Sequence, residues 1–156
     1  MITKYKRKAL FLDRDGVINH DTGHVHRIQD FIFNTEIFKI CKNFQNRGFL
    51  IFIITNQAGI AKGYYDLKQF QKLNDWMLSV FNEHNISITK VYFCPHHPDF
   101  DKNCACRKPE PGMILKAKSE FNLDIQNSFL FGDKSSDIEA GKRAGIKNLT
   151  LYKIKQ

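Results

Sequence analysis

The chain has 156 residues, 42% hydrophobic and 26% charged, which is the balance expected of one globular domain with a single core. No apolar run is long enough to cross a bilayer and no leader-like segment follows the basic N-terminal residues, so we expect a cytoplasmic protein that does not associate with membranes. The net charge of +8 predicts an anionic partner. Because the basic residues are spread along the chain without a nucleic-acid-binding motif, this charge favours phosphorylated metabolites over nucleic acid.

Short apolar runs alternate with amphipathic stretches along the whole chain. Runs typical of buried strands occupy residues 9–12, 50–54, 88–93, 129–131 and 149–152. Helical spacing of apolar residues predicts helices over 38–44, 67–81, 111–117 and 135–144, with Asp66 as an N-cap and Gly145 as a C-terminal stop. We therefore expect an α/β fold, a single Rossmann-like domain over residues 1–156 with a mostly parallel sheet and helices on both faces.

Polar residues mark the carboxyl ends of the predicted strands, where parallel sheets bind their ligands. These ends carry Asp13, Thr55, Cys94 and Asp133. The connections over residues 14–36 and 94–110 are long, and long connections usually serve function. We expect the functional site at this edge of the sheet.

Two carboxylates follow the first predicted strand in the motif Asp13-Arg14-Asp15-Gly16. Where the strand breaks into a loop, both can point into one cleft. One carboxylate can then attack phosphorus while the other protonates the leaving group and later activates water. Carboxylates this close need a cation, and Mg²⁺ with oxygen ligands suits the purpose. The alternative is a loop in which both aspartates cap a helix.

Three further strand-end motifs predict groups that assist at a phosphate. The hydroxyl, amide and backbone N–H groups of Thr55-Asn56-Gln57 can cradle phosphate oxygens, and the cations of Arg107-Lys108 can offset developing charge. Asp133 can complete a Mg²⁺ site that Asp137, one helical turn further, supports. Taken singly, these motifs also fit a polar turn, two solvated cations and a helix cap.

A compact set of sulfur and imidazole groups predicts a second metal centre. In a cytosolic chain such a cluster indicates a metal rather than disulfides. Three thiolates and one imidazole form a closed tetrahedral set for a structural Zn²⁺ ion in the loop over residues 94–106, which leads directly into Arg107 and Lys108. The predicted ligands are Cys94, His96, Cys104 and Cys106, with His97 as a competitor for the histidine position. We expect the isolated Cys41 to lie in the core.

In order and spacing, the strand-end motifs resemble those of the haloacid dehalogenase superfamily, over nearly the whole chain. The resemblance implies an aspartyl-phosphate mechanism with Asp13 as nucleophile and Asp15 as general acid and base. It also implies that Asp13, the backbone carbonyl of Asp15 and Asp133 hold Mg²⁺. Thr55 would bind the phosphoryl group, and Lys108 would position it against the nucleophile.

The zinc loop narrows the resemblance to the superfamily's heptose bisphosphate phosphatases, which lack a large cap. It implies hydrolysis of D-glycero-D-manno-heptose 1,7-bisphosphate at the 7-phosphate, with this small phosphorylated sugar as the partner. By the same resemblance, Arg107 would contact the distal phosphate or the sugar, and Asn19 and Gln57 would touch the substrate. We expect a monomer without a nucleic-acid partner.

Other functions remain alternatives to this interpretation. Histidinol-phosphate phosphatases share the same motifs and zinc loop. A nucleic-acid 3′-phosphatase with this fold is a further alternative. A zinc-stabilised nucleic-acid binding module would suit the positive charge, but it leaves Asp13, Asp15 and Asp133 unexplained, because acidic strand ends repel phosphate backbones.

Overall fold

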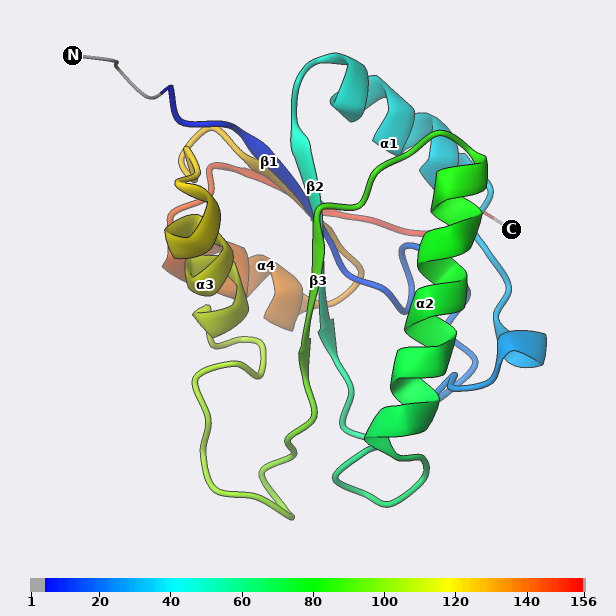
Figure 1. The fold of residues 1–156 in the computed structure, drawn as a ribbon. Coiled ribbons are helices and arrows are strands. Elements are labelled where there is room, and N and C mark those ends of the chain that lie inside the picture. Colours follow the sequence, from blue (N-terminus) through cyan, green and yellow to red (C-terminus); the bar gives the residue numbers. More distant parts are fainter. Residues whose placement is uncertain (1–4, 156) are drawn as a thin grey trace.

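A computed structural model describes residues 5–155; Lys4 in the basic N-terminal segment and the ends of the predicted 1–156 domain lie outside this range. A single parallel sheet forms the centre of the molecule (Figure 1). Its spatial order is β3-β2-β1-β4-β5. The strands are β1 (Ala9–Leu12), β2 (Leu50–Asn56), β3 (Lys90–Cys94), β4 (Phe129–Gly132) and β5 (Asn148–Leu151). The predicted parallel α/β fold is confirmed.

Helices cover both faces of this sheet, as the apolar strands require. In Figure 1, α1 and α2 lie on one side of the sheet and α3 and α4 on the other. Along β1, Leu10 and Leu12 pack into the core of the first side, and Ala9 and Phe11 into that of the second, because successive side chains of a strand point to opposite faces. The helices are α1 (Glu36–Asn46), α2 (Leu67–Glu83), α3 (Gly112–Phe121) and α4 (Ser135–Ala144), and a 3₁₀ turn, η1, spans Ile28–Asp30.

The helix boundaries follow local signals in the sequence. Asp66 caps α2 in a reciprocal capping box with Gln69, as predicted. Gly145 ends α4 in the left-handed conformation. The N-cap of α4 is Lys134 rather than Asp133 or Ser135, so the simpler helix-cap interpretation of Asp133 is wrong. Among the described residues, no helix combines the length and apolar character that crossing a bilayer would need.

The strand order creates a crevice beside the end of β1. Strand β1 pairs with β2 on one side and with β4 on the other, so the chain connections diverge at the carboxyl ends of β1 and β4. The Asp13 N–H continues the ladder by donating to the carbonyl of Phe131 at 3.1 Å. The segments over 13–35, 57–66 and 95–111 are the connections that leave the ends of β1, β2 and β3. These connections enclose the candidate site.

Candidate active site

Asp13 lies at the end of β1 against a buried ammonium group. The Lys108 Nζ donates to Asp13 Oδ1 at 2.9 Å and to the carbonyl of Ile54 at 3.0 Å, and it forms an ion pair with Asp137 Oδ1 at 2.6 Å. The Lys108 side chain is almost completely buried. A buried charge of this kind is stable only when paired, so Asp13 and Asp137 together fix the ammonium beside the end of β1.

Asp133 completes a group of three carboxylates. Ligand oxygens of Asp13, Asp133 and Asp137 lie within 4.8 Å of one another. Gly16 makes this approach possible, because it has a φ of +93° and a Cβ in its place would collide with the Asp133 carboxylate. Asp133 Oδ1 is buried and has no hydrogen-bond partner among the described residues. An oxygen of this kind fits a Mg²⁺ ligand, which would satisfy it.

The pKa shifts within the cluster are also those expected of a site for a divalent cation. Burial, reinforced by the charge of Asp137, raises the pKa of Asp13 well above its ordinary value against the opposing charge of Lys108. Burial likewise raises the pKa of Asp133. Burial alone would lower the pKa of Lys108, but the charges of Asp13 and Asp137 outweigh it and hold this pKa above its usual value. A single ammonium beside three carboxylates leaves room for a divalent cation.

Asp15 lies at the mouth of the crevice in a cage of nitrogen donors. Its Oδ1 accepts from Arg14 Nη2 at 3.0 Å and Nε at 3.3 Å, and from Asn19 Nδ2 at 3.0 Å. Its Oδ2 accepts from Gln57 Nε2 at 3.2 Å. The side chain of Asp15 is 19% exposed, whereas that of Asp13 is 10% exposed. The two aspartates of the motif therefore occupy different surroundings.

The Thr55-Asn56-Gln57 segment supports the site from the end of β2. Thr55 and Asn56 still pair with β3, so the strand is longer than predicted. Gln57 Nε2 donates to Thr55 Oγ1 at 2.8 Å. The Asn56 side chain bonds both the N–H and the carbonyl of Lys108, at 3.1 and 3.3 Å, and so holds the segment that carries the ammonium.

A cavity of about 540 Å³ opens beside these groups. Asp13, Asp15 and Lys108 line it together with Arg107, whose Nη1 donates to the carbonyl of His96 at 3.3 Å. Asn19 is fully buried and is not among the lining residues, so the structure places it behind Asp15 instead.

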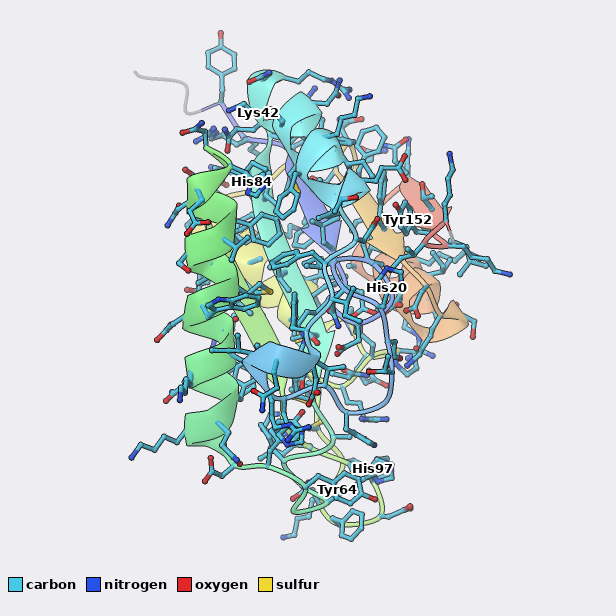
Figure 2. All side chains as sticks on the ribbon, turned by 90° about the vertical axis from the view of Figure 1, so that its right-hand side faces the viewer. His20, Lys42, Tyr64, His84, His97 and Tyr152 are labelled. Atoms are coloured by element: carbon cyan, nitrogen blue, oxygen red, sulfur yellow. A yellow bond between two sulfur atoms is a disulfide. The ribbon has the colours of Figure 1, made fainter. Side chains whose placement is uncertain are left out.

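Several residues at this cavity were not singled out from the sequence. They come from the loops that follow β1, β2 and β4, and the only signal for them was their place in these connections. These lining residues are His24, Lys62, Tyr65 and Lys134. Figure 2 shows Tyr64, which precedes Tyr65 in the sequence, at the same end of the molecule as His97 of the 94–106 loop.

The predicted zinc ligands come together beyond β3. Ligand atoms of Cys94, His96, Cys104 and Cys106 lie within 4.8 Å of one another. Four of their separations are 3.4–3.6 Å. Zn–S and Zn–N bonds of about 2.3 and 2.0 Å imply separations of roughly 3.3–3.8 Å in a tetrahedron, so the four groups fit Zn²⁺. His97 lies apart, accepting from the Asp99 N–H at 3.1 Å.

One pair of sulfurs in this cluster approaches more closely than the others. The sulfurs of Cys94 and Cys106 lie in direct contact, across a Cα–Cα distance of 5.6 Å. The pairing arises because the loop folds back so that residues 12 apart in sequence meet. The loop thus brings all four predicted zinc ligands together. Cys41 is buried in the core, as predicted.

This geometry defines the class of protein. A parallel sheet whose strand ends carry two unlike aspartates, a buried lysine and a third carboxylate is the arrangement of the haloacid dehalogenase superfamily. The chain also matches the family described as "Polynucleotide kinase 3 phosphatase" over residues 9–149. A HAD-like phosphatase from Mesorhizobium loti superimposes with a TM-score of 0.88 at 32% identity, covering 96% of this chain and 74% of the other.

Curated relatives narrow the class further. A D-glycero-alpha-D-manno-heptose-1,7-bisphosphate 7-phosphatase from Campylobacter jejuni is 53% identical over 146 residues, 94% of this chain and 83% of that protein. The corresponding beta enzyme from Helicobacter pylori is 46% identical, covering 92% of this chain and 83% of that protein. A D,D-heptose 1,7-bisphosphate phosphatase from B. bronchiseptica, complexed with magnesium and phosphate, superimposes with a TM-score of 0.82 at 28% identity, covering 89% and 77%. The chain belongs to the polynucleotide kinase 3 phosphatase family and, within it, groups with the heptose-1,7-bisphosphate 7-phosphatases.

Proposed function

We propose that the protein is a Mg²⁺-dependent phosphatase that removes the 7-phosphate of D-glycero-D-manno-heptose 1,7-bisphosphate through an aspartyl-phosphate on Asp13. The observation that carries this proposal is the contrast between two neighbouring aspartates. Asp13 is buried against Lys108, whereas Asp15 stands at the cavity mouth among neutral and cationic donors. Carboxylates in unlike surroundings suit unlike roles, one as nucleophile and one as proton carrier.

The first half of the reaction forms the bond between Asp13 and phosphorus. Oδ1 of Asp13 is engaged by Lys108 and by the Arg14 N–H, so we assign the attack to Oδ2. As the Oδ2–P bond forms, the bond from phosphorus to the sugar oxygen breaks. The protonated Asp15 gives its proton to that oxygen, which leaves as an alcohol.

The second half restores the enzyme. Asp15, now a carboxylate, takes a proton from a water molecule as that water attacks phosphorus, and the Asp13–phosphate bond breaks to release inorganic phosphate and regenerate the Asp13 carboxylate. Lys108 and Thr55 hold the phosphoryl oxygens through both steps. When bound by Asp13, Asp133 and the backbone carbonyl of Asp15, Mg²⁺ supplies positive charge against the phosphoryl group.

Arg107 and the zinc loop give the proposed substrate selectivity. Arg107 lines the cavity and rests on His96, one of the predicted zinc ligands. A guanidinium in this place can grip the second phosphate of a bisphosphate. We further propose that the enzyme acts in the cytoplasm, because thiolate ligands persist in a reducing compartment, and that it is a monomer there.

A second candidate follows from the description of the matching family. That description favours a nucleic-acid 3′-phosphatase with the same chemistry. The test is inorganic phosphate release with Mg²⁺ from the α and β heptose bisphosphates, histidinol phosphate and a DNA 3′-phosphate. The proposal predicts a strong preference for one heptose anomer. A preference for histidinol phosphate or DNA would overturn the proposed substrate but not the proposed mechanism. If none of these compounds released phosphate in a Mg²⁺-dependent way, the proposed reaction itself would be wrong.

A further inference from the structure

Arg14, between the two aspartates of the motif, is the largest of the fully buried side chains and is only 2% exposed. A buried guanidinium needs a charged partner to offset the loss of water. That partner is Asp15, at 3.0 Å. Arg14 is therefore part of the interior around Asp15, and the reaction steps above give it no role.

A second contact ties Arg14 to the loop that walls the cavity. Its Nη2 donates to the carbonyl of Val25 at 2.6 Å, and the guanidinium carbon lies 5.9 Å from the ring centre of Phe31. Val25 and Phe31 are both buried, and the adjacent His24 lines the cavity. The guanidinium of Arg14 thus links the Asp15 carboxylate to the loop that carries Val25 and His24.

The hydrogen bonds of Asp15 also distinguish its two oxygens. Oδ1 accepts from two nitrogens of Arg14 and from Asn19, whereas Oδ2 accepts from Gln57 alone among the described residues. The Gln57 amide is itself oriented, because its Oε1 accepts from the buried Tyr65 hydroxyl and its Nε2 also donates to Thr55. Oδ1 is the saturated oxygen, which leaves Oδ2 to carry a proton.

We propose that Arg14 is a positioning residue for proton transfer, which holds Oδ1 of Asp15 so that Oδ2 faces the leaving oxygen of the substrate. This inference rests on the proposed function and deepens it. A proton carrier must lie within hydrogen-bond reach of the leaving oxygen, and small displacements slow the transfer strongly. Only the rigid fork of an arginine can place Nε and Nη2 on one carboxylate oxygen and still reach Val25, so a lysine should not substitute.

The test compares substrates that differ in their need for a proton. A sugar oxygen must be protonated to leave, whereas p-nitrophenolate leaves without one. In Arg14→Lys, kcat/KM for heptose bisphosphate should fall by about 100-fold, while that for p-nitrophenyl phosphate should stay within about threefold of wild type. The value of kcat/KM reports the step in which the leaving group departs. Both substrates are assayed on one preparation, so their ratio does not depend on the fraction of folded enzyme.

Matched variants keep the inference falsifiable. Arg14→Met retains the aliphatic stem and should show the same selective loss, whereas Arg47→Lys, an exposed arginine stacked on Phe44 and Phe49, should change neither substrate. Equal losses on both substrates, or no loss on either, would overturn the positioning role. If the wild type cleaves p-nitrophenyl phosphate and β-glycerophosphate but not heptose bisphosphate, only the substrate proposal fails, and β-glycerophosphate then serves as the alkyl substrate in the same comparison.

Discussion

Two clusters of potential metal ligands lie at the same edge of the sheet, and they are built differently. The carboxylates of Asp13 and Asp133 follow the ends of β1 and β4, which pair with each other through main-chain hydrogen bonds. Of the four sulfur and imidazole ligands, Cys94 alone belongs to a strand, and Cys104 and Cys106 lie in a loop without helix or strand. The first cluster has a scaffold independent of its metal, whereas the second has little beyond its own ligands.

Because of this difference, we expect Mg²⁺ to serve the reaction and Zn²⁺ to serve the structure of the loop. Loss of Mg²⁺ from the carboxylate cluster should stop chemistry and leave the sheet in place. Loss of Zn²⁺ from the sulfur cluster should loosen the loop, and through Arg107 and Lys108 the disturbance would reach the phosphate site. The loop also packs on α3, since a Cβ at Gly112 would collide with the carbonyl of Ala105. The following predictions test this separation.

The largest expected effect belongs to Asp13→Asn. An amide cannot act as the nucleophile, so phosphate release should fall by at least about 1,000-fold. The free energy of unfolding should change by less than about 2 kcal/mol, because the strand ends hold the backbone there. Phosphate assays and urea unfolding measure the two quantities, with the exposed Asp75→Asn as control. Substantial residual turnover would exclude Asp13 as the nucleophile.

Lys108→Met should affect both activity and stability. Removing the ammonium takes a positive charge from the phosphoryl group, and we expect turnover to fall by roughly 100- to 1,000-fold. It also leaves Asp13 and Asp137 buried without their partner, which should destabilise the fold by about 3 kcal/mol. The control is Lys90→Met, which breaks the surface pair with Glu120 and a cation–π contact with Tyr92, both away from the site. If Lys108→Met unfolds at the same urea concentration as wild type, this ammonium does not stabilise the carboxylate cluster.

Zinc removal should act mainly through the loop. The reduced protein should hold about one Zn²⁺ per chain. A zinc chelator should lower the free energy of unfolding by about 3 kcal/mol or more. Turnover should fall by roughly tenfold or more, as misplacing a substrate-positioning group does, and added Zn²⁺ but not Mg²⁺ should restore it.

Cys104→Ser should reproduce the effect of zinc removal. The buried Cys41→Ala is the matched control, which should retain zinc. Metal analysis by mass spectrometry and thermal unfolding follow the change. A protein that contains no zinc when purified under reducing conditions, yet is fully active, would refute the structural-zinc role.

The sequence predicts the fold well because the central strands β1 and β2 are apolar runs covered on both faces. It places the end of β2 too early, since the pairing of Thr55 and Asn56 with β3 depends on a neighbouring strand rather than on hydrophobic pattern. The candidate site was predictable as a set because parallel strand ends converge. Asp13 and Asp133, which follow the ends of the paired strands β1 and β4, meet for that reason.

Side-chain partners within the site could not be predicted in the same way. Asn19 was expected near the substrate, but its amide bonds Asp15 and it does not line the cavity. Asn56 does line the cavity, yet the bonds of its amide to the backbone of Lys108 were not predicted. In the sequence nothing distinguishes Arg14 from the other basic residues, of which there are 24 in all. Its burial depends on the position of Val25 in the folded loop. These contacts depend on the path of irregular loops, which no periodic pattern in the sequence predicts.

The narrowest expected effect, on one kinetic constant for one substrate, tests the link between the two clusters at Arg107. Its guanidinium rests on the carbonyl of His96 and lines the cavity, so the zinc loop sets its position. Arg107→Ala should raise KM for heptose bisphosphate by about 10- to 100-fold, since a hydrogen-bonded charge on the second phosphate is lost. KM for p-nitrophenyl phosphate, which has one phosphate, should not change. The exposed Arg143→Ala, which loses only the surface pairs with Glu110 and Glu139, is the control. An equal rise in KM for both substrates would place Arg107 at the reacting phosphate. The zinc loop would then position a group that assists the reaction rather than one that selects the substrate.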